Sequence, residues 1–185
     1  METGPKNHRR LFFALWPNAA ERAALAAWQP TLQELCGGRA MRPETLHCTL
    51  LFLGNVAAHR LEALTLAARE VVMHPFTLEL AAAHCWGHNR IVYAAPTSLP
   101  PELAGLVAGL EAALHRHRFH FDARDYQPHV TLLRAACRTD GQWPPVPVVR
   151  WDCRDFVLLE SRRAENGARY EVLARFGCGI TCFAH

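Results

Sequence analysis

The sequence contains almost no lysine and no long apolar segment. Lys6 is its only lysine, so arginine supplies nearly all of the positive charge, and the net charge is +3. Arginine suits bidentate contacts with phosphate, but the pI of about 8.6 lies below the value of roughly 9 that dedicated nucleic-acid binders usually exceed. No segment approaches the roughly 18 consecutive apolar residues that a transmembrane helix needs. The composition therefore permits a nucleic-acid partner without demanding one, and we expect no membrane span.

A secretory signal is not expected either. The opening METGPKNHRRLFFALWP places basic residues before an apolar stretch, but that stretch is shorter than the roughly 7–15 residues of a signal peptide's apolar region. Pro17 and Asn18 then end it. We interpret it as a first β-strand, and we expect the protein to be cytoplasmic.

The cysteines show no pattern of pairs. They are seven in number and scattered along the chain, at Cys36, Cys48, Cys85, Cys137, Cys153, Cys178 and Cys182. Cys48 falls within an apolar strand pattern, where a free thiol behaves as a small hydrophobic side chain. Disulfide frameworks are typical of small secreted domains with little core, whereas 50% of these residues are hydrophobic. We therefore expect free thiols, which fits a reducing cytoplasm.

The hydrophobic periodicity predicts one α+β domain over residues 1–185. Apolar runs and alternating patterns predict strands at 9–15, 46–53, 76–83, 90–96, 126–136, 156–162 and 169–176. Helical spacing predicts helices at 19–28, 58–73 and 100–118. Pro30 is expected to end or kink the first helix, and the Pro-rich segment 143–149 is expected to be a loop. The order β-α-β-α-β-β-α-β-β-β predicts mostly antiparallel sheets with helices on their outer faces.

One short pattern occurs twice, and it is the only internal repeat. HCTLLFLG begins at His47, and HVTLLRAA begins at His129. Side chains alternate along a strand, so His47 and Thr49 share one face, about 6.7 Å apart, while Cys48 faces the other way. The second copy does the same with His129 and Thr131. If the two strands lie near each other, two histidines and two threonines converge on one cleft.

This set of groups suits a phosphate. Imidazole titrates near neutrality, so one histidine can act as a base while the other acts as an acid. Threonine hydroxyls can donate to phosphate oxygens. Two histidines that straddle a phosphodiester require no metal, and a strained cyclic phosphate is the natural substrate. Arg134 lies at the end of the second strand. Alternation places its side chain on the face away from His129, unless a bulge shifts the alternation by one residue.

The paired motifs resemble the H-x-T-x signatures of the 2H phosphoesterase superfamily. Within it, the chain is similar to the RNA 2′,3′-cyclic phosphodiesterases, formerly called bacterial 2′-5′ RNA ligases. The similarity extends nearly end to end, through RLFFAL, LHCTLLFLG, the R-x-V strand at 90–92, PHVTLLR and the final SRR…RY hairpin. It implies a bilobal, pseudo-twofold α+β fold in which two mostly antiparallel sheets flank a central cleft. Each lobe would contribute one H-x-T-x strand to a single domain.

The resemblance also implies roles for the motif residues. His47 would protonate the departing 3′ oxygen, and His129 would activate water. Thr49 and Thr131 would hold the phosphate. The substrate would be an RNA with a 2′,3′-cyclic phosphate end, such as a tRNA fragment, and the product would be a 2′-phosphomonoester. No metal and no cofactor would take part, and a monomer is expected.

Three further side chains are assigned to substrate binding. Arg134 is the candidate phosphate contact, while Phe13 and Tyr126 are the candidates for stacking on bases. Phe12 and Phe13 alternate along their strand, so one of them faces the core, and core packing is the default role of any such aromatic side chain. Three further arginines could contact the RNA backbone, although simple exposure to solvent is their default role. They are Arg90, Arg162 and Arg163.

Several alternatives remain open at this point. The same site could join RNA halves reversibly through a 2′-5′ linkage without ATP, or act on a small nucleotide such as a cyclic ADP-ribose phosphate. A non-catalytic module that holds RNA 3′ ends belongs to a different class, and a zinc-binding protein to another. The zinc candidates, whose spacing is irregular, are Cys178, Cys182 and His185 in one group, His84, Cys85 and His88 in a second, and the histidines of HRHRFH at 115–120.

Overall fold

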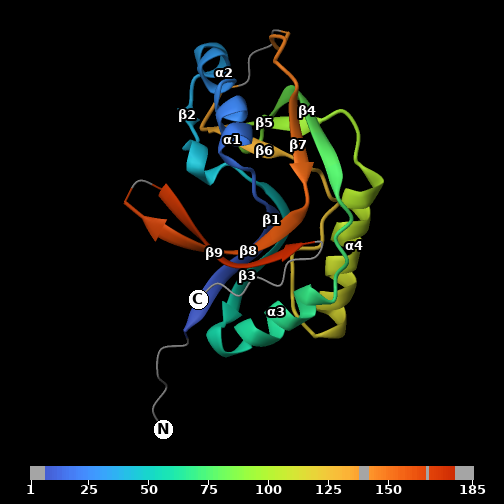
Figure 1. The fold of residues 1–185 in the computed structure, drawn as a ribbon. Coiled ribbons are helices and arrows are strands. Elements are labelled where there is room, and N and C mark those ends of the chain that lie inside the picture. The colour runs from blue at the N-terminus through green and yellow to red at the C-terminus, as the bar shows by residue number, and fades with distance from the viewer. Residues whose placement is uncertain (1–6, 138–141, 166, 178–185) are drawn as a thin grey trace.

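The computed structural model describes residues 7–137, 142–165 and 167–177 (Figure 1). Its strands are β1 His8–Leu15, β2 Arg39–Ala40, β3 Cys48–Ala57, β4 Phe76–Trp86, β5 Ile91–Pro96, β6 Val130–Arg134, β7 Val149–Cys153, β8 Asp155–Ala164 and β9 Gly167–Gly177. Its helices are α1 Ala19–Ala26, α2 Gln29–Cys36, α3 Leu61–Arg69 and α4 Pro101–Arg116, with 3-10 turns η1 Pro43–Thr45 and η2 Ala58–Arg60. No helix in these described segments is long and apolar enough to span a membrane.

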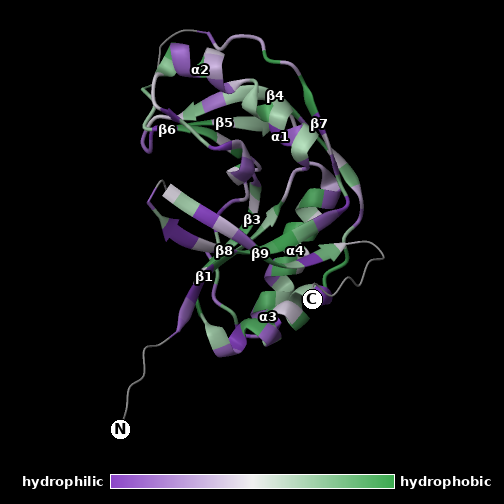
Figure 2. Ribbon diagram, turned by 60° about the vertical axis from the view of Figure 1, so that its left-hand side comes forward, coloured by the Kyte–Doolittle hydropathy of each residue, from purple (hydrophilic) through white to green (hydrophobic). Residues whose placement is uncertain are grey.

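The strands form one connected sheet in the order β7-β4-β5-β6-β3-β1-β8-β9, and β2 also pairs with β6. Every pairing is antiparallel, which confirms the predicted α+β class. The two predicted sheets are one connected sheet, because β3 and β6 are joined through one residue pair, Cys48 and Val130. This pair divides the sheet into a half built from β7, β4, β5, β6 and β2 and a half built from β3, β1, β8 and β9 (Figure 2).

The helices are exchanged between these two halves. α1 and α2 come between β1 and β3 in the chain, yet they pack against β7 and β6 of the other half (Figure 1). α4 comes between β5 and β6, yet it packs against β3 and α3. One continuous cluster of buried side chains contains residues from both halves. The exchange of helices therefore ties the two halves together around a shared core.

Local signals explain where α1 and α2 begin. Asn18 caps α1: its side-chain oxygen accepts from the backbone N–H of Glu21 (2.9 Å), and the Glu21 carboxylate accepts from the backbone N–H of Asn18 (2.7 Å). Pro30, expected to end or kink this helix, instead lies in the first turn of α2. Proline fits that position because the first-turn N–H groups have no partner within the helix. The predicted helix at 19–28 corresponds to α1, and the second helix, α2, was missed.

β7 is another element that the sequence did not predict, as is the short strand β2. It begins at Val149, the last residue of the Pro-rich segment that was expected to be a loop, and it pairs with β4 at the edge of the sheet. Its side chains alternate, with Val149, Trp151 and Cys153 buried and the two residues between them exposed. An edge strand needs only one partner, so prolines immediately before it do not interrupt the sheet.

Candidate active site

The pairing of Cys48 with Val130 brings the two H-x-T motifs side by side. Because the strands are antiparallel, His47 lies towards Thr131, and Thr49 lies towards His129. Both histidines precede their strands, since β3 begins at Cys48 and β6 at Val130. The predicted strands had included both histidines, and the structure places them instead in the loops that enter the strands.

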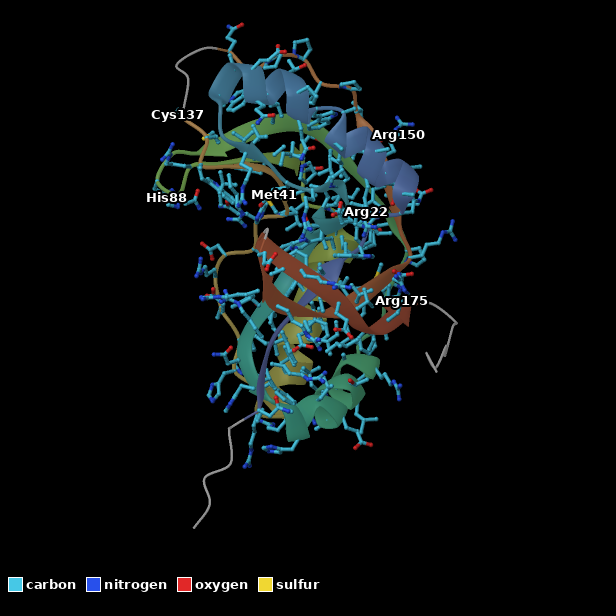
Figure 3. All side chains as sticks on the ribbon, turned by 90° about the vertical axis from the view of Figure 1, so that its left-hand side faces the viewer. Arg22, Met41, His88, Cys137, Arg150 and Arg175 are labelled. Carbon is cyan, nitrogen blue, oxygen red and sulfur yellow. The ribbon has the colours of Figure 1, made fainter. Side chains whose placement is uncertain are left out.

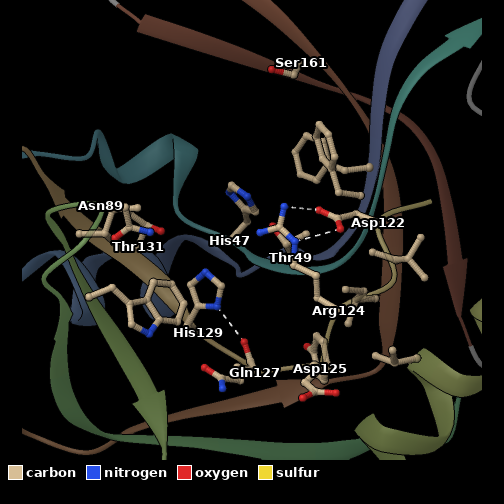
Figure 4. Close-up of a pocket in the computed structure, with 18 of the residues that line it drawn as sticks. His47, Thr49, Asn89, Asp122, Arg124, Asp125, Gln127, His129, Thr131 and Ser161 are labelled. Atoms are coloured by element: carbon tan, nitrogen blue, oxygen red, sulfur yellow. Dashed lines mark hydrogen bonds and ion pairs between the residues drawn. The ribbon is translucent and has the colours of Figure 1, made fainter.

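A cavity of about 780 Å³ lies over this junction and is lined by residues of both halves of the sheet. All four motif side chains, His47, Thr49, His129 and Thr131, line it (Figure 4). Arg134 lines the same cavity. The convergence that the repeated motif predicted is therefore present in the folded chain.

The two histidines have the same orientation relative to their own backbones. Nδ1 of His47 lies 2.7 Å from the carbonyl oxygen of Thr45, and Nδ1 of His129 lies 2.8 Å from that of Gln127 (Figure 4). A carbonyl oxygen only accepts hydrogen bonds, so Nδ1 must be the donor in both rings. This selects the same tautomer twice and leaves Nε2 of each ring as the nitrogen that exchanges a proton.

Burial makes His47 a weak base in the empty cavity. Its pKa is lowered to about 4, mainly because burial penalises the charged ring, and the positive charges of His129, Arg134 and Arg22 lower it further. The hydrogen bond to Thr45 opposes this shift. Three aromatic rings surround the imidazole, at centroid distances of 5.1 Å for Phe12, 6.1 Å for Trp16 and 5.0 Å for Tyr170.

His129 experiences the same effect from the other half of the sheet. Burial lowers its pKa, the hydrogen bond to Gln127 opposes the shift, and Arg134 lowers the pKa further. Trp86 lies 4.5 Å away between ring centroids and Tyr93 lies 5.6 Å away. Both histidines are therefore mostly neutral near pH 7 in the empty cavity. For one ring to act as an acid, a proton must bind to it, and a bound anion favours that protonation.

A bulge in β6 brings Arg134 to the cavity. Thr131 pairs with Tyr93 and Leu133 with Val92, so Leu132 is an extra residue on this strand. An extra residue reverses the alternation. Leu132 and Leu133 are accordingly both fully buried, and Arg134 lines the cavity with the motif side chains. This is the irregularity that alternation had required for Arg134 to share the face of His129 and Thr131.

β3 carries the equivalent bulge at the equivalent position. Thr49 pairs with Ala14 and Leu51 with Phe13, which leaves Leu50 as the extra residue. Phe52 consequently lines the cavity, three residues after Thr49, as Arg134 stands three residues after Thr131. The two motifs therefore have matching backbone irregularities but end in different side chains, one aromatic and one cationic.

The assignment of Phe13 to substrate binding is wrong. Phe13 is completely buried in the core, 6.0 Å from Phe156 and 6.2 Å from Phe176 between ring centroids. Phe12 faces the opposite side of β1 and lines the cavity beside His47. Alternation established that the two rings face opposite sides of the strand. Only the packing of β1 against its neighbours determines which side is the cavity.

Tyr126 does line the cavity, but its hydroxyl is directed elsewhere. The hydroxyl oxygen lies 3.6 Å from Sγ of Cys48. Burial raises the pKa of Tyr126 well above its ordinary value, and the Cys48 thiol adds to this rise. The ring thus supports the point where β3 meets β6, so its contact with a base remains a prediction.

The other arginines named from the sequence differ in their contacts. Arg90 donates to the backbone carbonyls of Ala135 (3.0 Å) and Ala136 (3.2 Å), which ties it to the end of β6. Arg162 forms ion pairs with Glu160 (2.8 Å) and Glu171 (3.1 Å). Both guanidinium groups are therefore engaged in contacts within the protein.

The cavity includes residues that the sequence reasoning did not single out. Trp86 at the end of β4 stacks on Tyr93 with a centroid distance of 4.1 Å, and it lines the cavity beside His129. Tyr170 and Ser161 are paired residues of the β8–β9 hairpin, and both line the cavity. The R-Y of the final hairpin was noted as part of the resemblance, and Tyr170 is its tyrosine. No spacing within the sequence connected these residues to the motifs.

The described segments contain no group of three or more His, Cys, Asp or Glu side chains arranged to hold a metal ion. His84, Cys85 and His88 therefore do not form such a group, and His84 instead faces the Tyr93 ring at 5.7 Å. The histidines of HRHRFH at 115–120 form no such group either, and the candidates at 178, 182 and 185 lie outside the described residues.

Known proteins share this fold and much of this sequence. A family model described as LigT like Phosphoesterase matches residues 15–93. The Escherichia coli K12 protein named RNA 2′,3′-cyclic phosphodiesterase is 33% identical over 170 residues, which cover 91% of this chain and 96% of the relative. A Thermus thermophilus protein of the same name is 31% identical over 176 residues, which cover 90% of this chain and 89% of the relative.

Solved structures give the same result. The crystal structure of E. coli LigT complexed with 3′-AMP has a TM-score of 0.85 at 31% identity, covering 94% of this chain and all of that one. The fold and the paired motifs are those of a phosphoesterase. The chain belongs to the LigT-like phosphoesterase family.

Proposed function

We propose that this protein hydrolyses 2′,3′-cyclic phosphodiester ends of RNA to 2′-phosphomonoesters. The observation that carries the proposal is the equivalent pair of histidines: each donates through Nδ1 to a carbonyl two residues earlier, and both line one cavity. Such a pair supplies two proton-transferring Nε2 atoms on either side of a bound phosphorus. The names of the relatives point to the same substrate.

In this mechanism His129 is the proton acceptor and His47 the proton donor. Nε2 of His129 takes a proton from water while the water oxygen forms a bond to phosphorus. The bond between phosphorus and the 3′ oxygen breaks, and Nε2 of His47 gives its proton to that oxygen. The direction of these transfers follows the resemblance to the family, since the two histidines have the same backbone geometry.

His47 must be protonated for this step, although its pKa in the empty cavity is about 4. A bound phosphodiester carries a negative charge, which favours a protonated imidazole within a few ångströms. Proton uptake is then coupled to substrate binding. The low pKa of the empty site disfavours a charged His47 when no anion is present.

The remaining motif residues hold the phosphate. The hydroxyls of Thr49 and Thr131 donate to its non-bridging oxygens, and Arg134 adds a positive charge beside the same cavity. Both threonines directly precede a bulge. A regular strand would place the third residue after each threonine on the opposite face, so the bulges complete the wall of the cavity.

The proposal also covers the arrangement of the lobes, the oligomeric state and the location of the protein. The two halves of the sheet would act as two lobes of a single domain, related by a pseudo-twofold axis through the Cys48–Val130 pair, with the cavity as the cleft between them. We further propose a monomer that works in the cytoplasm without a metal or cofactor. RNA fragments derived from tRNA are one source of its substrate.

The test uses a short RNA that ends in a 2′,3′-cyclic phosphate, incubated with the protein in EDTA. A 2′-phosphate end is the expected product, and a 3′-phosphate would contradict the assigned leaving group. His47→Ala and His129→Ala should each abolish turnover while the circular dichroism spectrum stays unchanged. Retained turnover in either variant would reject the two-histidine mechanism. Binding without turnover in the wild-type protein would instead support a module that holds RNA 3′ ends.

A second reaction is favoured by the position of Trp86. Its ring is stacked on Tyr93 beside His129, the histidine that activates the nucleophile in the proposed mechanism. A nucleoside stacked there could offer its 5′-hydroxyl in place of water, which would form a 2′-5′ linkage. Adding an RNA with a 5′-hydroxyl to the same assay separates the two reactions. A joined product that Trp86→Ala removes would support this second reaction.

A further inference from the structure

We propose that the body of the RNA leaves the cavity over an arginine rim formed by Arg39, Arg42, Arg134 and Arg163. This inference rests on the proposed function and deepens it. The rim would contact phosphates upstream of the terminal nucleotide and so distinguish RNA ends from cyclic mononucleotides. It begins at Arg134, which lines the cavity, and the other three arginines lie beyond the residues that line it.

The first observation is a pair of like charges with no counter-ion. Arg39 of β2 and Arg134 of β6 are register partners, so their Cβ atoms are about 4.5–5.5 Å apart on one face. Both side chains are exposed, and neither forms an ion pair within the described segments. Like charges directly opposite each other are destabilising in a sheet. A bound anion removes that repulsion.

The second observation is that the β8–β9 hairpin meets this pair from the other half of the sheet. Nη1 of Arg39 lies 3.9 Å from the point that a Cβ on Gly167 would occupy. Arg42 donates through Nη2 to the carbonyl of Ala168 (2.8 Å), and its Nε pairs with the exposed carboxylate of Glu44 (3.6 Å). Arginines of the β2 and η1 region therefore reach the tip of a hairpin whose Ser161 and Tyr170 line the cavity.

Arg163 faces the same side as the cavity. Ser161 lines the cavity and pairs with Tyr170, and Arg163 pairs with Ala168 in the same unbroken register. Residues two apart on a strand share a face, so Arg163 extends the cavity face of the hairpin towards its tip. Arg169 pairs with Arg162 on the opposite face.

The third observation is that acidic side chains line the end of the cavity away from the arginine rim. Figure 4 shows Asn89 and Thr131 on one side of the two histidines and Asp122, Arg124 and Asp125 on the other. Arg134 belongs to the first side, because its register partner on β5 is Ile91, two residues after Asn89.

The end of the cavity that contains Asp122 and Asp125 is less favourable for binding a phosphate. Asp122 is paired with Arg124 (2.6 Å), whereas Glu111 and Asp125 line the cavity with no ion pair among the described residues. Arg10 at this end lies over the Phe52 ring at 5.0 Å. Two unpaired carboxylates disfavour a phosphate chain there, which leaves the arginine rim as the exit for the RNA.

The test compares two substrates, a cyclic mononucleotide and an RNA of about eight nucleotides with the same cyclic end. Arg39→Gln and Arg163→Gln should each raise KM for the RNA roughly five-fold at low salt, and the slope of log KM against log salt should fall by about 0.7 for each contact removed. Turnover of the mononucleotide should not change, which also shows that the variants are folded.

Two matched controls make the test specific. Arg150 is exposed, and Figure 3 shows it on the opposite side of its half of the sheet from His88, which lines the cavity. Arg150→Gln should leave both substrates unaffected. Arg169→Gln alters an arginine of the same hairpin on the opposite face, so at 0.15 M salt, where the Debye length is about 8 Å, its effect should be clearly smaller than that of Arg163→Gln.

The outcomes separate this inference from the proposed function. Equal losses for both substrates, no loss for either, or an equal effect of Arg169→Gln would each overturn the arginine rim. If the wild-type protein hydrolyses neither substrate, the proposed function itself fails. A loss confined to the RNA, with a reduced salt slope, supports the rim.

Discussion

Cys48 and Val130 form the one residue pair through which β3 and β6 are joined. Each is the central residue of an H-x-T motif, and each is completely buried. The join between the two halves of the sheet and the assembly of the candidate site are therefore the same structural event. A change that opens this pair should separate the histidines as well as the halves.

The buried amide of Gln29 should be important for holding the two motifs in place. Its Nε2 donates to the carbonyls of Met41 (2.7 Å), in the segment before the first motif, and Leu132 (3.1 Å), within β6. Gln29→Ala should lower the free energy of unfolding by roughly 1–3 kcal/mol, because the Met41 carbonyl loses its side-chain donor and the Leu132 carbonyl keeps only the backbone N–H of Met41 (2.8 Å). Urea denaturation measures this. The control is Gln33→Ala, whose exposed bond to Gly38 should cost much less, and equal losses would contradict the prediction.

The lowered pKa values of His47 and His129 determine the expected pH dependence. The proposed reaction needs one neutral and one protonated imidazole, and both pKa values lie below 6.5 in the empty cavity. The singly protonated form therefore becomes rarer as the pH rises above both values. Because kcat/KM reports the free enzyme, it should fall about tenfold per pH unit between pH 7 and 8. A profile that is flat or rising over that range would contradict the assigned burial effect.

Phe12 and Phe13 provide a matched pair of core and cavity substitutions. Phe12→Ala should admit water beside His47 and raise its pKa, because burial is the largest cause of the lowered value. The falling limb of the pH profile should then move to higher pH. Phe13→Ala should cost roughly 3–5 kcal/mol of stability and leave the profile of the folded fraction unchanged. If it does not fold, Phe13→Leu serves instead. A shifted profile in the Phe13 variant would contradict its placement in the core.

The Cys48 thiol should report whether the two halves ever separate. Burial raises its pKa to about 11, so very little reactive thiolate exists at pH 8. Iodoacetamide at pH 8 should label the exposed Cys137 and leave Cys48 unmodified, as peptide mass spectrometry can measure. Denaturation should make both react. Labelling of Cys48 in the native protein at the rate of Cys137 would mean that the β3–β6 pair opens readily.

The sequence by itself determined which motif side chains share the candidate site and the general class of the fold. Two copies of H-x-T at the start of apolar strands identified His47, Thr49, His129 and Thr131, because the period of a strand is a local property that any reader of the sequence can apply. The antiparallel α+β class followed from the periods and the order of the predicted elements. Such signals need no knowledge of which segments meet.

Only the tertiary structure decided which face of each strand lines the cavity and which distant elements add residues to it. The position of Phe12 rather than Phe13 in the cavity depends on the packing of β1, and the arrival of Arg134 depends on a bulge visible only in the pairing of β6 with β5. Trp86 and Tyr170 come from elements remote from either motif. Register and burial are relations between segments, so no period within one segment can specify them.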